Sequence, residues 1–585
     1  MPVPAQSVGN PHVSASRQRL VVRMREVEED LQNLKRSYNA LSATNSIPPE
    51  ILSNIFIIHN ASIIQTYPAT TFQREAFSWI YVAHVCHHWR EVALNCGALW
   101  SNLLFLKPSL TETMLTRSKN SPLTVKLLGH NNPIFEPSLS KILSQTHRLR
   151  SVNLSGNVKD TLLSNASGSA PLLEELTLEA FGNLSSKIPM AFLQGGAPSL
   201  KAMNLKGIDI PFWGSLPLGP NLTHLRLDLM SLQHAHRPSA SAFMKSLEEL
   251  PLLQLLSLSG SLPIDTYPKW TSTSSPPIFR NLRDLFIDDT FSALSQFVQA
   301  EAIKIPKTAM VAITLDYSFQ NPEAIGRFLL ELRERWEGLK APIPGLAIFK
   351  TFEPGHLHDD DFGFNIYLDP SSDLFRRDRP DFIFNFSNTT DTLTCGEVFK
   401  AFVEELDLSH VQTLRISEGM SPLTANEWRM VCTDLKALKT VIFETSDVSD
   451  FLGQLGKVPT NIDSTIPVTA PFPSLSKLVF HCLNFLQYFD TGSHFTSALI
   501  SALKRQQEAS HLPVKLEILA CNGFNHTQHK KVCKSLPNLG FLWDNYEDDC
   551  DEDDEEDDDN EGEGEWEDED DDDSDIEDDS EEDEA

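Results

Sequence analysis

Two short stretches, Leu149-Arg-Ser-Val-Asn-Leu154 and Leu173-Glu-Glu-Leu-Thr-Leu178, decide the fold, because each has an apolar residue at its first, fourth and sixth positions. Side chains alternate between the two faces of a β-strand, so the fourth and sixth positions share one face. Each stretch is therefore predicted to be a short strand with one buried face. The pattern occurs six times between residues 149 and 287, as Leu149/Val152/Leu154, Leu173/Leu176/Leu178, Leu200/Met203/Leu205, Leu222/Leu225/Leu227, Leu253/Leu256/Leu258 and Leu282/Leu285/Ile287.

The spacing of these stretches indicates a repeat architecture. Their first positions lie 24, 27, 22, 31 and 29 residues apart, which brackets the period of leucine-rich repeats. Stacked repeats of one strand and one helix or irregular turn bury a continuous leucine core that no single repeat could build. The predicted fold class for residues 104–546 is an α/β solenoid of irregular leucine-rich repeats. Less regular copies are Met310/Ile313/Leu315, Ile343/Leu346/Ile348, Val411/Leu414/Ile416, Leu438/Val441/Phe443, Leu475/Leu478/Phe480 and Leu516/Leu519/Cys521.

Helical periodicity between the later strands predicts helices over residues 321–339, 426–438 and 495–509, which would cover the outer face. The residue between the fourth and sixth positions of each stretch should point away from the leucine core, and we expect these residues to bind a substrate. They are Asn153, Thr177, Asn204, Arg226, Ser257 and Phe286. Residues 349–388 fit the pattern poorly. Alternating phenylalanines at 382, 384 and 386 predict a strand there, and residues 353–361 an exposed loop insertion.

The charge of the chain is concentrated at one end. The 585 residues include 81 acidic and 48 basic side chains, and 30 of the acidic ones lie in residues 547–585, which contain no Lys or Arg. Such a tail cannot bury enough apolar surface to offset its entropy and self-repulsion, so we expect it to be disordered. Residues 1–546 are nearly neutral, which argues against direct nucleic-acid binding. Ser574 and Ser580, each with an acidic residue three positions on, resemble acidophilic casein-kinase sites.

The N-terminal residues do not read as a secretory signal, and the longest dense apolar run, residues 250–258, is about half of a membrane span. We expect an intracellular protein, in the cytoplasm, the nucleus or both, with no membrane association. Residues 1–16 are expected to be a disordered lead. The eight cysteines are scattered without a Cys-x-x-Cys pair, which favours buried free thiols.

Residues 17–44 are predicted to form a heptad helix. Apolar residues alternate at spacings of four and three over three heptads, while the intervening positions are mostly charged. The helix has two interpretations, a coiled coil that dimerises or a single amphipathic helix packed on the next domain. Three heptads are short for a two-stranded coil. The apolar positions are Leu20, Met24, Val27, Leu31, Leu34, Tyr38 and Leu41.

Residues 45–103 are predicted to form a compact helical domain. Ser46 can cap a helix whose first turn contains Pro48 and Pro49, and an apolar face follows from Ile51. After a Thr- and Ser-rich stretch, helical spacing resumes at Phe77 and continues to Trp100.

Catalytic chemistry has little support in the sequence. The chain lacks the motifs of phosphate loops, dinucleotide sites, nucleophile elbows and zinc proteases, so neither enzymatic activity nor a cofactor is expected. The run His356-Leu-His358-Asp-Asp-Asp361 has ligand types that suit a divalent ion, but such runs are common in solvated loops. His84, Cys86, His87 and His88 point in different directions on one helix, which favours a structural role over metal binding.

Two half-motifs in the helical domain carry a resemblance. They are Ile47-Pro-Pro-Glu-Ile-Leu-Ser-Asn-Ile-Phe56 and Val82-Ala-His-Val-Cys-His-His-Trp-Arg-Glu-Val-Ala-Leu94, closing on Ala98-Leu-Trp100. Together they resemble an F-box, and the order of heptad helix, box and degenerate leucine-rich repeats is similar to that of many fungal F-box proteins. The chain departs from the family pattern at Ile47, His87 and His88, and by roughly 20 residues inserted between the two halves.

The resemblance implies a non-catalytic adaptor. An F-box docks on the Skp adaptor of a cullin ubiquitin ligase, and the repeats hold a protein substrate. About half of the apolar residues in the box are expected at this interface and the rest in the core of the box. The residues assigned to adaptor binding are Pro48, Pro49, Glu50, Ile51, Leu52, Ile55, Val85, Cys86, Trp89, Arg90 and Trp100.

One alternative function stays open at this point. The chain could be a scaffolding repeat protein with a vestigial box, whose acidic tail binds basic partners such as histones. Copurification of the Skp adaptor would separate the two interpretations. An enzyme is a distant third.

Overall fold

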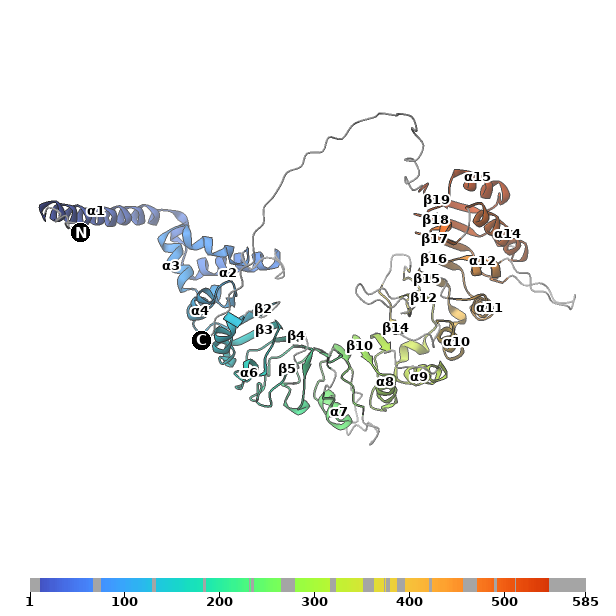
Figure 1. Ribbon diagram of the computed structural model, residues 1–585, viewed down its shortest axis with the longest axis horizontal. Coiled ribbons are helices and arrows are strands. Elements are labelled where there is room, and N and C mark those ends of the chain that lie inside the picture. The colour runs from blue at the N-terminus through green and yellow to red at the C-terminus, as the bar shows by residue number, and fades with distance from the viewer. Residues whose placement is uncertain are drawn as a thin grey trace, which may run out of the picture.

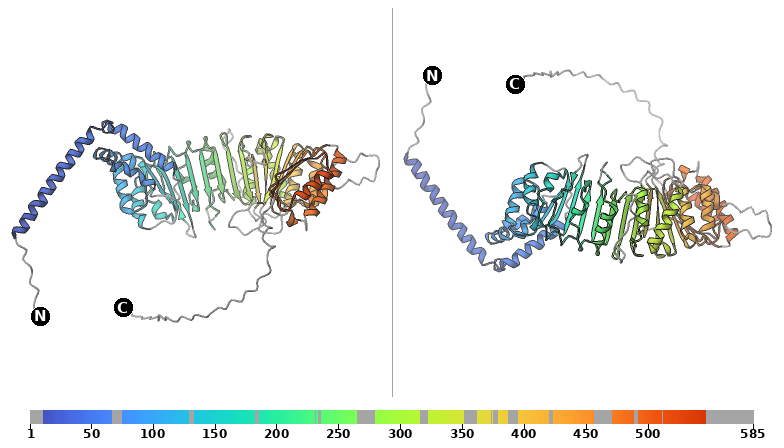
Figure 2. Two further views of the ribbon diagram at one scale, coloured as in Figure 1. Left: turned by 90° about the horizontal axis from the view of Figure 1, so that it is seen from above. Right: turned by 90° about the horizontal axis from the view of Figure 1, so that it is seen from below.

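The chain folds into an N-terminal helical region followed by a large, mostly parallel β-sheet with helices, an α/β arrangement (Figure 1). The sheet is curved, its strands line the inner side of the arc, and the helices lie along the outer side (Figures 1 and 2). This computed structural model describes residues 11–66, 75–128, 133–181, 186–230, 232, 236–264, 279–315, 322–350, 362–372, 374, 379–386, 395–419, 423–455, 471–488, 492–510 and 512–546.

The helical region begins with a long isolated helix. Its elements are α1 (Pro11–Ala40), η1 (Ala43–Ser46), α2 (Pro49–Thr66), η2 (Glu75–His84), α3 (His87–Asn95) and η3 (Gly97–Trp100). Helix α1 starts at Pro11, inside the segment expected to be a disordered lead. A proline suits the first turn of a helix, and no Gly or Pro follows it before residue 40, so nothing delays the helix until residue 17.

Seventeen strands form one continuous sheet. Its spatial order follows the chain from β1 to β11 and from β15 to β19, apart from the small β5–β7 pair, which forms a separate two-stranded sheet. The strands are β1 (Asn102–Leu103), β2 (Leu123–Leu127), β3 (Leu149–Gly156), β4 (Glu175–Ala180), β5 (Ser186–Lys187), β6 (Ala202–Lys206), β7 (Ile208–Asp209), β8 (His224–Asp228), β9 (Leu255–Ser259), β10 (Asp284–Asp289), β11 (Met310–Leu315), β12 (Gly345–Lys350), β13 (Phe362–Tyr367), β14 (Phe382–Phe386), β15 (Thr413–Gly419), β16 (Thr440–Ser446), β17 (Lys477–His481), β18 (Lys515–Leu519) and β19 (Gly540–Trp543).

Helices and short 3-10 turns connect the strands. They are α4 (Pro108–Arg117), η4 (Pro133–Phe135), α5 (Glu136–Leu143), η5 (Thr146–Arg148), α6 (Asp160–Leu163), η6 (Trp213–Ser215), α7 (Ala240–Glu248), α8 (Phe291–Gln299), α9 (Pro322–Arg335), η7 (Glu337–Lys340), α10 (Cys395–Glu405), η8 (Leu408–His410), α11 (Ala425–Asp434), α12 (Ser449–Leu455), α13 (Phe485–Tyr488), α14 (Gly492–Ser510) and α15 (His526–Ser535). Helices α9, α11 and α14 confirm the three helices predicted from the sequence.

The leucine pattern fills one continuous core between the sheet and the helices. The apolar triads of the first eleven template segments are buried, except that Met310 sits at the margin with 9% exposure. The twelfth triad is wrong, because Leu519 is only half-buried whereas Leu516 and Ile518 face the core. Leu516 pairs with Leu478 and Ile518 with Phe480, so the true register is shifted by three residues from the predicted one.

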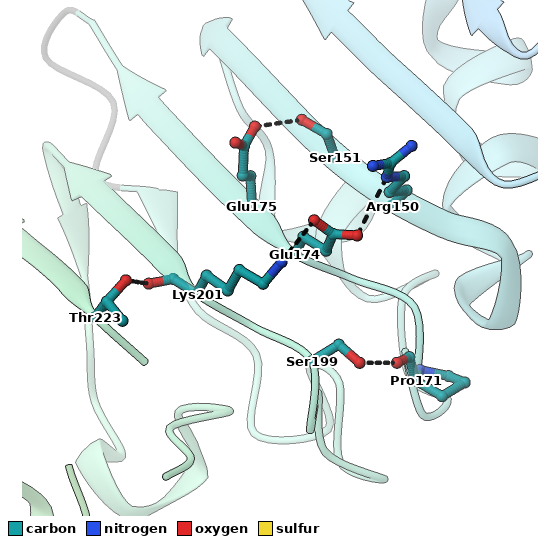
Figure 3. A network of polar contacts seen from close by, with 8 residues as sticks. All are labelled: Arg150, Ser151, Pro171, Glu174, Glu175, Ser199, Lys201 and Thr223. Carbon is teal, nitrogen blue, oxygen red and sulfur yellow. Dashed lines mark hydrogen bonds and ion pairs between the residues drawn. The ribbon is translucent and has the colours of Figure 1, made fainter. Parts of the chain in front are cut away.

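Polar contacts link the residues that directly precede neighbouring strands (Figure 3). The backbone N–H of Lys201 donates to the carbonyl of Glu174, and that of Thr223 to the carbonyl of Lys201, both at 2.8 Å. Glu174 accepts side-chain hydrogen bonds from Lys201 at 3.1 Å and from Arg150 at 3.2 Å. The Lys201 hydrogen bond and the Arg150 charge lower the pKa of the Glu174 carboxyl. These contacts tie together the beginnings of adjacent strands in the sheet.

The sheet contains one reversal. Strand β12 pairs with β15, not with β11, and β13 and β14 fill the space between them. Strand β13 runs antiparallel to both β12 and β14. Strand β14 confirms the strand predicted from the alternating phenylalanines, whereas the expected loop at residues 353–361 lies outside the described residues. Strand β13 was not predicted.

A buried ion pair ties the chain before α7 to the end of β10. Asp289 is 0% exposed, and its Oδ1 accepts from Arg237 Nη1 at 2.6 Å and from the Thr290 N–H at 2.8 Å. Its Oδ2 accepts from the Leu262 N–H at 3.0 Å. The carboxylate therefore satisfies a cation and two backbone donors at once.

The outcome of the remaining sequence predictions differs between the termini, the cysteines and the helices. Residues 547–585, with Ser574 and Ser580, lie outside the described residues, as do residues 1–10. Of the described cysteines, Cys521 is buried as expected, whereas Cys482 and Cys533 are exposed and the other four are half-buried. Among the helices that the structure describes, none has both the length and the apolar character needed to cross a membrane.

Candidate interaction surfaces

The helical region has its own aromatic core. Trp79 packs edge-on against Trp100 with ring centroids 5.0 Å apart, and Phe56 lies 5.2 Å from Trp89. The indole N–H of Trp100 donates to the carbonyl of Ala93 at 2.9 Å. This core holds α2, η2, α3 and η3 together and is continuous with the core of the sheet.

One face of helix α2 is buried, and another face is apolar but exposed. Leu52 and Phe56 are buried, whereas Ile51, Ile55 and Ile58 are 52%, 45% and 69% exposed. The spacing of the three isoleucines places them on one face of the helix. We call these three residues the isoleucine stripe. A run of exposed branched apolar side chains on one helix face is unusual for a protein surface without a partner.

The other residues assigned to adaptor binding are also placed by the structure. Pro48, Pro49 and Glu50 are exposed at the start of α2. Val85 is 60% exposed just after η2, Arg90 is exposed, and Cys86 and Trp89 are half-buried. The Cys86 sulfur caps α3 by accepting from the Trp89 N–H at 3.5 Å, and its thiol donates to Asn45 Oδ1 at 3.3 Å.

Two assigned residues lie where no partner can reach them. Leu52 is 1% exposed and Trp100 is 2% exposed, so both belong to the core of the helical region. Tyr81, which the sequence reasoning did not assign, is 72% exposed and apolar. In a helix that begins at Pro49, Leu52 lies on a different face from Ile51 and Ile55. This periodicity could have separated core residues from exposed residues in the sequence.

The expectation that His84, Cys86, His87 and His88 share one helix is wrong, because His84 ends η2, Cys86 precedes α3 as its N-cap, and His87 and His88 begin α3. His87 Nδ1 lies 3.6 Å from Glu91 Oε2 on the same helix. Within the described ranges, no three His, Cys, Asp or Glu side chains gather in a way that could hold an ion. The run from His356 to Asp361 lies outside those ranges.

The second surface is the inner face of the sheet. The six residues predicted to point away from the core are in register across neighbouring strands, and Lys126 of β2 extends the row. Arg226 and Lys126 are exposed and the others half-buried. Their register confirms the predicted alternation, and we call these residues the inner row: Lys126, Asn153, Thr177, Asn204, Arg226, Ser257 and Phe286.

Charge on the first half of the inner face is partly uncompensated. Lys206 pairs with Asp228 at 3.5 Å beside the inner row. Within the described residues, no ion pair involves Lys126 or Arg226. These two cations flank three short polar side chains, Asn153, Thr177 and Asn204. The carboxylate of Glu179 lies on the same face and accepts from Asn204 Nδ2 at 3.3 Å, so this part of the face offers a partner charges of both signs and hydrogen-bonding groups.

The second half of the inner face is covered by the chain itself. Leu374, from the connection between β13 and β14, packs with Ala347, Tyr367, Ile442 and Val479, all of which are buried. Because these four residues alternate away from the main core, their burial shows that the connection lies over the sheet.

Ionic contacts hold this covered region. Arg415 Nη1 donates to the carbonyl of Leu374 at 2.7 Å, and Arg415 also bonds Glu444. Glu444 Oε1 lies 3.3 Å from His481 Nδ1. On the next strand, burial alone raises the pKa of the Glu517 carboxyl, but hydrogen bonds from Lys515 and Lys477 outweigh it and hold that pKa below its usual range. The open part of the inner face is therefore the stretch from β2 to β10.

Comparison with models of known protein families gives no match for this chain, and comparison with curated proteins gives none either.

Proposed function

We propose that the chain is a non-catalytic substrate-recognition adaptor of a cullin-type ubiquitin ligase. Its helical region acts as an F-box that binds the Skp adaptor, and its sheet is a solenoid of irregular leucine-rich repeats that binds a protein substrate. The observation that carries this proposal is the isoleucine stripe of α2. It lies beside Pro48, Pro49 and Glu50 in the half-motif that resembles an F-box, and it is exposed although the aromatic core next to it is complete.

The stripe has the properties of an anchor for partner helices. Each isoleucine is held on a helix whose opposite face is packed, so little side-chain or backbone ordering would oppose binding. Burying the exposed area of such residues contributes about 25 cal/mol per Å². A neighbouring carboxylate, Glu50, and the cation Arg90 supply a polar rim of the kind found at protein interfaces.

Substrate binding is assigned to the open part of the inner face. Extended inner surfaces are where stacked repeats bind their partners. Among the described residues, Leu374 covers part of the inner face between β12 and β17. The alternative of a scaffold with a vestigial box would use the same inner face but would leave the isoleucine stripe without a partner.

Adaptor binding is tested on the full chain, because the core of the helical region continues into the sheet and Arg117 lies over the Trp100 ring at 4.6 Å. The double variant Ile51→Glu/Ile55→Glu should weaken binding of the purified Skp adaptor by about a hundredfold or more, since charge would replace buried apolar contacts. Isothermal titration calorimetry measures the affinity. The thermal midpoint should remain close to wild type because both positions are exposed.

The matched control is Leu330→Glu on α9. Leu330 is 45% exposed, as is Ile55, and also lies on a helix, but far from α2 (Figure 1). It should bind the Skp adaptor like wild type. If the unmodified chain does not bind the Skp adaptor at micromolar concentration, the ligase proposal is wrong and the scaffold alternative replaces it.

Substrate binding is tested by reversing the two unpaired cations of the inner row. The variant Lys126→Glu/Arg226→Glu should lose the proteins that copurify with wild type, measured by quantitative mass spectrometry, but should retain the Skp adaptor. The control Lys245→Glu/Lys504→Glu makes the same charge change at exposed lysines of α7 and α14, on the outer side of the arc. Equal partner sets in both variants would contradict binding at the inner row.

A further inference from the structure

Helix α1 presents an apolar seam that the other described residues leave uncovered. The seven seam residues are between 49% and 87% exposed. Figures 1 and 2 show α1 projecting away from the sheet and from α2 and α3. The interpretation of α1 as a helix packed on the next domain is therefore wrong. The seam consists of Leu20, Met24, Val27, Leu31, Leu34, Tyr38 and Leu41.

The sequence around the seam matches a second copy of the same helix. We infer that the chain forms a homodimer through a parallel, two-stranded coiled coil of α1. In heptad positions a to g, Met24, Leu31 and Tyr38 occupy a, and the remaining seam residues occupy d. Leucine occupies three of the four d positions, as is common in coiled coils, and the case for a second copy of this helix rests on the charged positions beside the seam. This inference is independent of the proposed ligase function.

Charge complementarity selects this partner and its direction. In a parallel dimer each g residue faces the e residue five positions later on the partner helix. Arg23 at g then faces Glu28, and Asp30 at g faces Lys35, so both kinds of charged pair are attractive. By symmetry each pair occurs twice.

The antiparallel alternative with full overlap is disfavoured. It pairs g with g and e with e, which places Asp30 opposite Asp30 and Glu28 opposite Glu28 of the second copy. In the single chain Arg23 Nη1 donates to Glu26 at 2.8 Å, but both side chains are more than half exposed. Replacing this solvated ion pair by one between Arg23 and Glu28 of the second copy costs little free energy.

The length of the seam sets the expected affinity. Within α1, which ends at Ala40, residues 20–40 span about 30 Å, or three heptads. Coils this short are marginal, so a dissociation constant on the order of micromolar is expected. In a parallel dimer both chains leave the coil at the same end, so two isoleucine stripes and two inner rows lie at that end. Once one copy has bound a partner molecule with two binding sites, the second copy meets that partner at a raised effective concentration.

Sedimentation equilibrium of the full chain at about 1 to 100 µM tests the dimer. The mass should rise with concentration from 65.6 kDa to twice that value. Val27→Glu, at a d position, should remain monomeric. Its matched control is Val22→Glu, at position f of the same helix, which should dimerise like wild type. The two valines are 52% and 50% exposed, so they differ in heptad position and hardly in surroundings.

The direction of the dimer has its own test. Glu28→Lys should weaken the dimer because it opposes Arg23, and Arg23→Glu/Glu28→Lys should restore it. A wild-type mass of one chain at 100 µM would overturn the inference, as would equal dissociation of both valine variants, a dimer that persists in Val27→Glu, or no recovery in the charge-swapped variant. Adaptor affinity of Val27→Glu should stay unchanged, so loss of the dimer and loss of ligase function are distinguishable.

Discussion

Asp289→Ala should reduce the free energy of unfolding by about 3 to 5 kcal/mol, because removing one partner of a buried ion pair leaves the other uncompensated. Asp289 is fully buried and holds Arg237 together with the backbone N–H groups of Leu262 and Thr290. The side chain of Arg237 is 20% exposed and cannot fully recover its solvation. Urea denaturation followed by circular dichroism measures the loss.

Two variants make this prediction specific. Asp289→Asn keeps an oxygen acceptor and should lie between wild type and alanine. Asp228→Ala removes a carboxylate from the same sheet whose pair with Lys206 is 3.5 Å long and partly solvated, so it should cost less than about 1 kcal/mol. A loss of the same size for Asp228→Ala and Asp289→Ala would contradict a special contribution from the buried pair.

Trp100→Ala should destabilise the helical region by about 3 to 5 kcal/mol. The indole is 2% exposed, contacts Trp79 and the Arg117 guanidinium, and donates to Ala93, so truncation leaves a cavity and an unpaired carbonyl. Hydrogen exchange of α2 and α3 should accelerate strongly while the strands from β9 to β19 stay protected. Adaptor binding should fall as a consequence of this opening.

The comparison with Ile51→Glu/Ile55→Glu separates two reasons for lost binding. The isoleucine variant should lose affinity with unchanged hydrogen exchange, whereas Trp100→Ala should lose protection and affinity together. Unchanged exchange in Trp100→Ala would show that the indole does not hold this core. The comparison therefore assigns Ile51 and Ile55 to contact with the Skp adaptor and Trp100 to the folded core of the helical region.

Local periodicity in the sequence predicted most of the strands. The apolar triads located the core-facing side of eleven segments, and the residues between them, such as Asn153 and Arg226, were correctly placed on the opposite face. The pattern failed at Leu519, which packs against the small inner-face cluster that includes Leu374 and Val479 and not in the main core. A residue's hydrophobicity does not tell which of two apolar surroundings it occupies.

Features that depend on contacts between distant segments were not predictable. Strand β13 reverses direction, and Asp289 is buried because a connection some fifty residues earlier in the chain supplies Arg237. Within the candidate site, the half-motifs located the helical region and periodicity places Leu52 and Ile55 on different faces of α2, but which of these faces is buried depends on how α2 docks. Periodicity describes a single element, whereas burial depends on its neighbours.

The sheet ends at an open edge. Strand β19 pairs with β18 on one side, and no described strand pairs with its other side. Such an edge can template addition of a foreign strand and lead to aggregation. Strand β19 is only four residues long, and the run of 30 acidic side chains begins four residues after Trp543. Two copies approaching edge to edge would bring these runs together, so their mutual repulsion would discourage fibrillar growth from the C-terminal end of the protein.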